Sequence, residues 1–166
     1  MSPEPVKALL VAPLLILALG TQVGAQDLPR EAVLPLELAR DAAQAAVEAC
    51  GEDGWQVSVA VVDRGGTLKA LLRADGAGPH TTDSSFKKAY TSASLRQPTG
   101  DYARLIVDNP EAQALRDMNE KILVLGGGLP IRFDDEVVGG IGVGGAPGGH
   151  LDEACARAGL EAIGAQ

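Results

Sequence analysis

The glycine-rich stretch at residues 126–160 reads GGGLPIRFDDEVVGGIGVGGAPGGHLDEACARAGL. Its pattern predicts two strands joined by a tight turn, then a glycine loop and a helix, at residues 129–133, 136–143, 144–149 and 151–163. Glycine at this density indicates a backbone that adopts positive φ or comes close to another group.

A second stretch at residues 57–79, VSVAVVDRGGTLKALLRADGAGP, has the same character. Val57, Val59 and Val61 alternate with other residues, which predicts a strand at residues 56–62. The glycines that follow predict a hairpin turn and a returning strand at residues 67–73.

The remaining patterns predict helices at residues 35–49, 81–95, 101–107 and 110–119, and a short strand at residues 122–125. Five strands joined mostly by hairpins predict a mainly antiparallel sheet. With helices flanking that sheet, the fold class is α/β (α+β). The sequence contains neither a phosphate-binding G-x-x-x-x-G-K-[ST] nor a C-x-x-C motif, and two histidines are too few for a His-rich zinc site.

The two glycine-rich blocks and the segments between them resemble the GlcG/HbpS-like family of haem-binding and haem-degrading domains. The matching pieces, in chain order, are VAVVDRGG, LLRADGAGP, KAYT, RQPT, GGGLPI and GGIGVGGAPGGHLDEACARAG. The resemblance implies a profilin-like sandwich with a five-stranded sheet. It also implies that residues 35–166 form one domain. The sequence before the first helix, residues 26–34, is expected to be a flexible N-terminal segment.

The first 25 residues have the three-part plan of a secretory signal peptide. Lys7 gives a basic start, residues 8–19 are almost wholly apolar, and Val23-Gly24-Ala25 supplies small residues for cleavage. The apolar run is shorter than the roughly 20 residues that a membrane-spanning helix needs. An uncleaved anchor is the alternative. We therefore expect a periplasmic or secreted protein without a stable membrane span.

The charge of the chain limits its partners. The formal net charge of −8 argues against nucleic acid as a partner.

The two cysteines bear on covalent structure. In an exported protein, two cysteines indicate one disulfide. The resembled fold packs its terminal helices side by side, and this implies a Cys50–Cys155 bridge. The alternative is two small buried residues in helix packing.

The resemblance also directs attention to histidines as haem ligands. His80 lies in a loop between a predicted strand and helix, and a neutral imidazole is a common ligand of haem iron. His150, in the other glycine loop, is the second candidate. Gly148 and Gly149 lie beside it at a helix start, where free N–H groups attract carboxylates such as haem propionates. The alternatives are a surface or capping histidine and glycines that serve a sharp turn.

Two further residues on the helix at 81–95 are candidates for a porphyrin site. Tyr90 could stack on the porphyrin or ligate its iron, and Lys87 could pair with a propionate. The alternatives are a tyrosine in the core and, for Lys87 with Lys88, a solvated helix face.

Three functions remain open at this point. The leading interpretation is an exported protein that binds or sequesters haem, with a role in haem sensing or handover. The second is an enzyme acting on a small carboxylated metabolite held by the glycine loops. The third is a self-assembling interaction module, since the resembled family forms homo-oligomers. Haem degradation is implied only by the family's name, and the residues assign no catalytic group.

Overall fold

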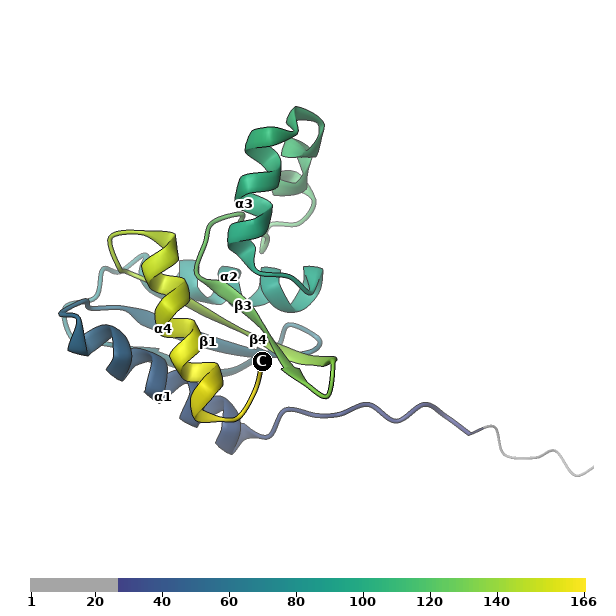
Figure 1. Ribbon diagram of the computed structural model, residues 1–166, viewed down its shortest axis with the longest axis horizontal. Coiled ribbons are helices and arrows are strands. Elements are labelled where there is room, and N and C mark those ends of the chain that lie inside the picture. The colour runs from purple at the N-terminus through teal and green to yellow at the C-terminus, as the bar shows by residue number, and fades with distance from the viewer. Residues whose placement is uncertain (1–26) are drawn as a thin grey trace, which may run out of the picture. The chain divides into compact units, whose positions relative to one another are not determined.

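The computed structural model describes residues 27–166 and is drawn in Figure 1. The predicted signal peptide lies outside the described residues. Residues 27–30 contain no helix or strand, and residues 31–166 form one compact unit. Within the described part of the chain, no helix is long and apolar enough to cross a membrane.

The compact unit alternates helices and hairpins. In chain order its elements are α1 (Leu36–Glu52), β1 (Ser58–Asp63), β2 (Leu68–Arg73), α2 (Thr81–Leu95), α3 (Thr99–Asp108), the 3-10 helix η1 (Pro110–Asp117), β3 (Gly128–Phe133), β4 (Glu136–Gly144) and α4 (Gly149–Ala162). The sheet has the order β2-β1-β4-β3, and each neighbouring pair is antiparallel. The predicted fold class is therefore confirmed.

The sheet separates two hydrophobic cores. Figure 1 shows α1 and α4 on one face and α2 on the other, while α3 and η1 project from the sandwich. Strand β1 serves both cores, because Val59 and Val61 pack toward α1 and α4 while Ala60 and Val62 pack toward α2. This alternation is the two-residue period that the sequence displays.

Glycines in β4 bring α2 unusually close to the sheet. Gly140, Gly142 and Gly144 recur at every second position, and a Cβ on any of them would collide with α2. At Gly142 that Cβ would overlap the Ser85 carbonyl oxygen and the Ala89 amide nitrogen. These glycines therefore serve close packing between helix and strand.

The sheet has four strands among the described residues, so the predicted fifth strand at residues 122–125 is wrong. The Leu123 N–H donates to the Thr91 hydroxyl (2.9 Å), and the Leu125 N–H donates to the Leu123 carbonyl (3.0 Å). Because these groups bond locally and to α2, the segment runs as a loop along that helix. It therefore does not extend the sheet.

A disulfide joins the two helices on one face of the sheet. Cys50 near the end of α1 and Cys155 in α4 are bonded, with their Cα atoms 5.5 Å apart. Both residues are buried in the larger core. The structure thus contains the pair that the family resemblance implied.

Candidate functional site

Two hollows lie on either side of α2. The larger, which we call the α2 groove, has a volume of about 630 Å³. Ten residues line it: Gly65, Gly66, Thr67, Leu68, Leu71, Thr82, Asp83, Phe86, Tyr90 and Lys121. The smaller, the glycine-loop pocket, measures about 370 Å³ and is lined by His80, Ser84, Lys88, Leu125, residues 144–149 and Asp152.

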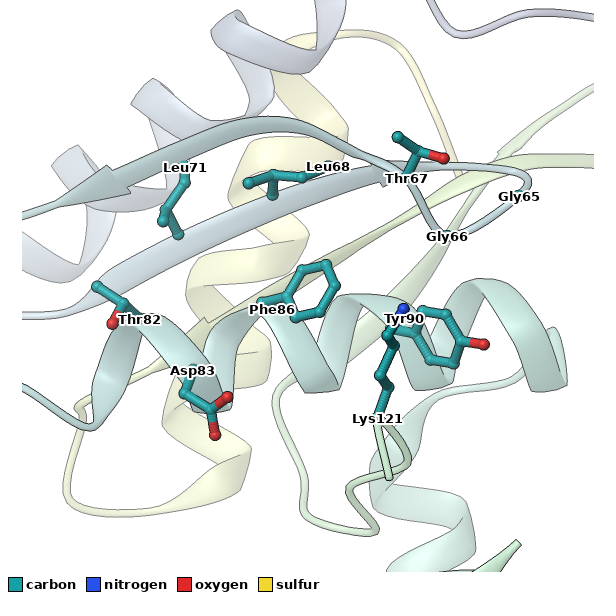
Figure 2. Close-up of a pocket in the computed structure, with 10 residues that line it drawn as sticks. All are labelled: Gly65, Gly66, Thr67, Leu68, Leu71, Thr82, Asp83, Phe86, Tyr90 and Lys121. Atoms are coloured by element: carbon teal, nitrogen blue, oxygen red, sulfur yellow. The ribbon is translucent and has the colours of Figure 1, made fainter. Parts of the chain in front are cut away.

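The α2 groove exists because α2 leaves part of the edge strand β2 uncovered. Leu68 and Leu71 lie opposite Val62 and Ala60 of β1, so they face the α2 side of the sheet. Their exposures are 44% and 39%. Figure 2 shows Leu71 directed from β2 toward α2, Leu68 beside it along the strand, and Phe86 directed from α2 toward both. The groove therefore has apolar side chains on both walls.

One end of the groove is formed by Tyr90. The Gly65-Gly66 turn lies against its ring, since a Cβ on Gly66 would come within 2.6 Å of two ring carbons. The Lys121 ammonium lies 5.4 Å from the ring centroid, within the range of a cation–π contact. In Figure 2 the Tyr90 hydroxyl points away from Phe86 and the leucines. Tyr90 therefore offers the groove its ring, and Lys121 brings a positive charge beside it.

The glycine-loop pocket contains a buried ion pair. Lys88 Nζ lies 2.7 Å from Asp152 Oδ2 and donates a second hydrogen bond to the Val143 carbonyl at 2.8 Å. The side chain of Lys88 is only 2% exposed. Asp152 Oδ1 accepts a hydrogen bond from the Ala146 N–H at 3.0 Å. The pair thus ties α2, β4 and the glycine loop together.

Burial raises the pKa of the Asp152 carboxyl above its ordinary value. The loss of hydration outweighs the attraction of Lys88 and the hydrogen bonds from Lys88 and Ala146. Both carboxylate oxygens and two protons of the ammonium are engaged within the protein. This arrangement fits a structural pair that holds the loop in place.

The packing and backbone conformation of the loop also require its glycines. Gly149 packs against the backbone of Gly126, since a Cβ on Gly149 would lie 3.0 Å from the Gly126 Cα. Gly145 has a φ of 135°, and a Cβ there would lie 2.5 Å from the Gln56 carbonyl oxygen. Helix α4 begins after Gly148 without a side-chain cap. The turn from β4 into α4 therefore requires glycine whether or not a ligand binds.

The predicted site residues fall into two groups. His80 precedes α2 and lines the glycine-loop pocket together with Gly148 and Gly149, whereas Tyr90 lines the α2 groove. His150 is exposed beside Gly148, whose added Cβ would lie 2.9 Å from the imidazole Cε1. Neither histidine lines the α2 groove. Among residues 27–166, no three His, Cys, Asp or Glu side chains are grouped to hold a metal ion.

The two lysines of α2 have different surroundings, and only Lys88 departs from the solvated face considered for both. Lys87 is half-buried, pairs with Asp83 at 3.1 Å and lines neither hollow. Lys88 is buried, so its predicted exposure is wrong. Burial of Lys88 beside Asp152 could have been predicted only if the contact between α2 and α4 were known.

Sequence reasoning missed the apolar walls of the α2 groove. Leu68 and Leu71 fit a strand pattern that does not reveal the strand's place at the sheet edge. Phe86 lies one turn before Tyr90, with ring centroids 6.3 Å apart, and this i, i+4 spacing was the available signal. Lys121 could not be assigned from sequence because it reaches the groove from a distant loop.

Comparison with known proteins gives a consistent result. The family model described as "Haem degrading protein HbpS-like" matches residues 34–161. The protein GlcG of Escherichia coli strain K12 is 32% identical over 111 residues, which cover 67% of this chain and 81% of GlcG.

Solved structures agree in fold. A double mutant of Streptomyces reticuli HbpS has a TM-score of 0.76 and 42% identity, covering 95% of this chain and 97% of that one. PduOC, solved as a haem complex, has a TM-score of 0.75 and 24% identity, covering 81% of this chain and 98% of its own. At that identity, the second similarity shows the fold alone.

Proposed function

The chain belongs to the HbpS-like family, and from that premise we propose that it binds haem in the α2 groove. The observation that supports this most is the composition of the groove walls. Leu68, Leu71 and Phe86 face one another across the hollow, and Lys121 lies at one end. A porphyrin has apolar faces and carboxylate side chains, and the groove offers a partner to each.

The residues present fit the porphyrin part of haem well. A volume of about 630 Å³ lies within the range typical of small-molecule sites. The fit to iron is weaker, because the ten lining residues include no histidine, cysteine or methionine, and the hydroxyl of Tyr90 points away from the apolar walls. When bound, haem would supply a redox-active iron, and the protein's own residues would hold the ring and exclude water from one face.

The proposal also names two candidate ligands for the iron. His80 is the predicted ligand, and it lies two residues before Thr82 of the groove lining. His150 is the second candidate. Both side chains are exposed, but neither lines the α2 groove, so ligation by either would require haem to extend beyond the groove.

A haem titration followed by absorbance tests the proposal. We expect a saturable, shifted Soret band for the protein from residue 26 onward. Leu68→Asp should abolish that shift, because a charge on the wall opposes burial of the ring. Leu105→Asp is the matched control, since Leu105 on α3 is 42% exposed and lies outside the groove. No saturable shift in the parent protein would reject haem binding.

The same titration tests the histidines. If His80 ligates the iron, His80→Ala should shift the Soret maximum of the complex, while His150→Ala should leave it unchanged. The reverse result would assign the ligand to His150. An unchanged spectrum in both variants would reject both as ligands.

Export and self-association complete the proposal. The predicted signal peptide and the Cys50–Cys155 disulfide both support an oxidising compartment outside the cytoplasm. The predicted homo-oligomer rests on the family resemblance. Sedimentation of the purified protein tests it, and a mass equal to one chain would reject it.

A further inference from the structure

We propose that the α2 groove recognises a porphyrin through its ring and one carboxylate, so that metal-free porphyrin binds about as tightly as haem. This inference rests on the proposed binding of haem in the groove. It specifies which part of the ligand the groove recognises. It follows from the chemistry of each lining residue.

The groove lacks a group suited to the iron. Asp83 has a carboxylate, but that carboxylate pairs with Lys87 at 3.1 Å. Tyr90 has a hydroxyl, but Figure 2 shows it directed away from the apolar walls. The two threonines offer only neutral hydroxyl groups. A ring held between the walls therefore meets carbon atoms on the faces where an axial ligand would approach.

The walls supply contacts that do not depend on a metal. Leu68 and Leu71 are 44% and 39% exposed in the free protein, so they have apolar surface left to bury. Burial of such surface against an apolar ring favours binding. The Phe86 side chain lies between these leucines and Tyr90, where it can contact a flat ring. These contacts are the same for a porphyrin with or without iron.

Charge fixes the orientation of the ring. Lys121 is exposed, and its ammonium lies over the Tyr90 ring with no carboxylate partner among the described residues. Asp83 lies toward the other end of the groove (Figure 2). A propionate is therefore attracted to the Tyr90 end, whereas at the other end the charge of Asp83 is already balanced by Lys87. Lys121 determines how the ligand lies, and it recognises the carboxylate rather than the metal.

The first experiment compares haem with protoporphyrin IX, which carries the same ring and carboxylates without iron. Binding of the metal-free ring is followed by its fluorescence anisotropy, and binding of haem by absorbance. We expect dissociation constants within ten-fold of each other. Protoporphyrin binding more than ten-fold weaker than haem would overturn the inference while leaving haem binding intact. If neither ligand binds, the proposed function itself is rejected.

The second experiment tests Lys121 directly. Lys121→Gln should weaken protoporphyrin IX binding two- to five-fold, as expected for an exposed ion pair. Lys69→Gln is the matched control, because Lys69 lies on β2 but does not line the groove. The dimethyl ester of protoporphyrin IX lacks free carboxylates, so Lys121→Gln should not change its binding. Equal effects of Lys121→Gln on acid and ester would overturn the carboxylate contact.

Discussion

Lys87 and Lys88 are neighbours in sequence with opposite surroundings. Lys88 is buried against Asp152, whereas about a third of the Lys87 side chain is exposed. We expect Lys88→Met to lower the free energy of unfolding by about 3 kcal/mol, because it leaves a buried carboxylate without its partner. Lys87→Met should change it by no more than about 0.5 kcal/mol. Urea unfolding of the two variants measures both, and equal effects would contradict the buried pair.

Because the pKa of Asp152 is raised, the stability of the protein should depend on pH in a defined direction. Between its ordinary pKa and the raised value, the folded state holds more protons at this group than the unfolded state. Its contribution to stability therefore increases as the pH falls from neutral toward about 4. Asp152→Asn removes the titration. The stability of the natural protein relative to this variant should rise on acidification, and a fall would contradict the pKa direction.

The chemistry of individual residues explains which site residues could be predicted from the sequence and which could not. The site predictions centred on His80, His150 and Tyr90, whose side chains carry recognisable ligand groups. The structure places only Tyr90 in the α2 groove, and there its ring faces the hollow. Leu68 and Lys121 were overlooked because neither type of residue signals a site without its neighbours.

Strand β4 determines how closely α2 can approach the sheet. Gly142→Ala should lower the free energy of unfolding by about 3 kcal/mol, since the added methyl meets α2 backbone atoms that cannot rotate away. Gly51→Ala is the control, because nothing lies within 4 Å of a Cβ at that position in α1. The control should be neutral or slightly stabilising. Thermal unfolding compares the two, and a neutral Gly142→Ala would contradict the close packing.

The disulfide fixes α1 to α4 over a long separation. Cys50 and Cys155 are 105 residues apart, so the bond removes much freedom from the unfolded chain. Cys50→Ala combined with Cys155→Ala should lower the free energy of unfolding by about 4 kcal/mol. Chemical denaturation of the double variant tests this. A stability equal to that of the natural protein would show that helix packing alone suffices.

Most elements were predictable because their patterns are local. Alternating valines predict β1, and apolar spacing predicts α1 and α4. The strand predicted at residues 122–125 was wrong because the Leu123 N–H bonds to the Thr91 hydroxyl on α2 and not to a neighbouring strand, and no local pattern reveals that contact. Residues 110–117 form a 3-10 helix, η1, whose start is capped by the Asn109 side chain.

The arrangement of the layers explains why the two hollows differ. Helix α2 covers β4 closely but leaves the edge strand β2 partly bare, so an apolar groove opens on one side of the helix. On its other side, the buried Lys88–Asp152 pair forms part of the wall of the glycine-loop pocket. The family resemblance predicted the sandwich, but it did not distinguish between the two hollows. That distinction depends on contacts between distant elements.

The most direct test of this account locates haem among the leucine methyl groups by NMR. Ferric haem is paramagnetic and broadens nearby signals. In protein with labelled leucine methyl groups, Leu68 and Leu71 should broaden first, while Leu105 on α3 keeps its line width. Leu125 lines the glycine-loop pocket and reports on that alternative. Broadening of Leu125 with sharp signals from Leu68 and Leu71 would contradict binding in the α2 groove.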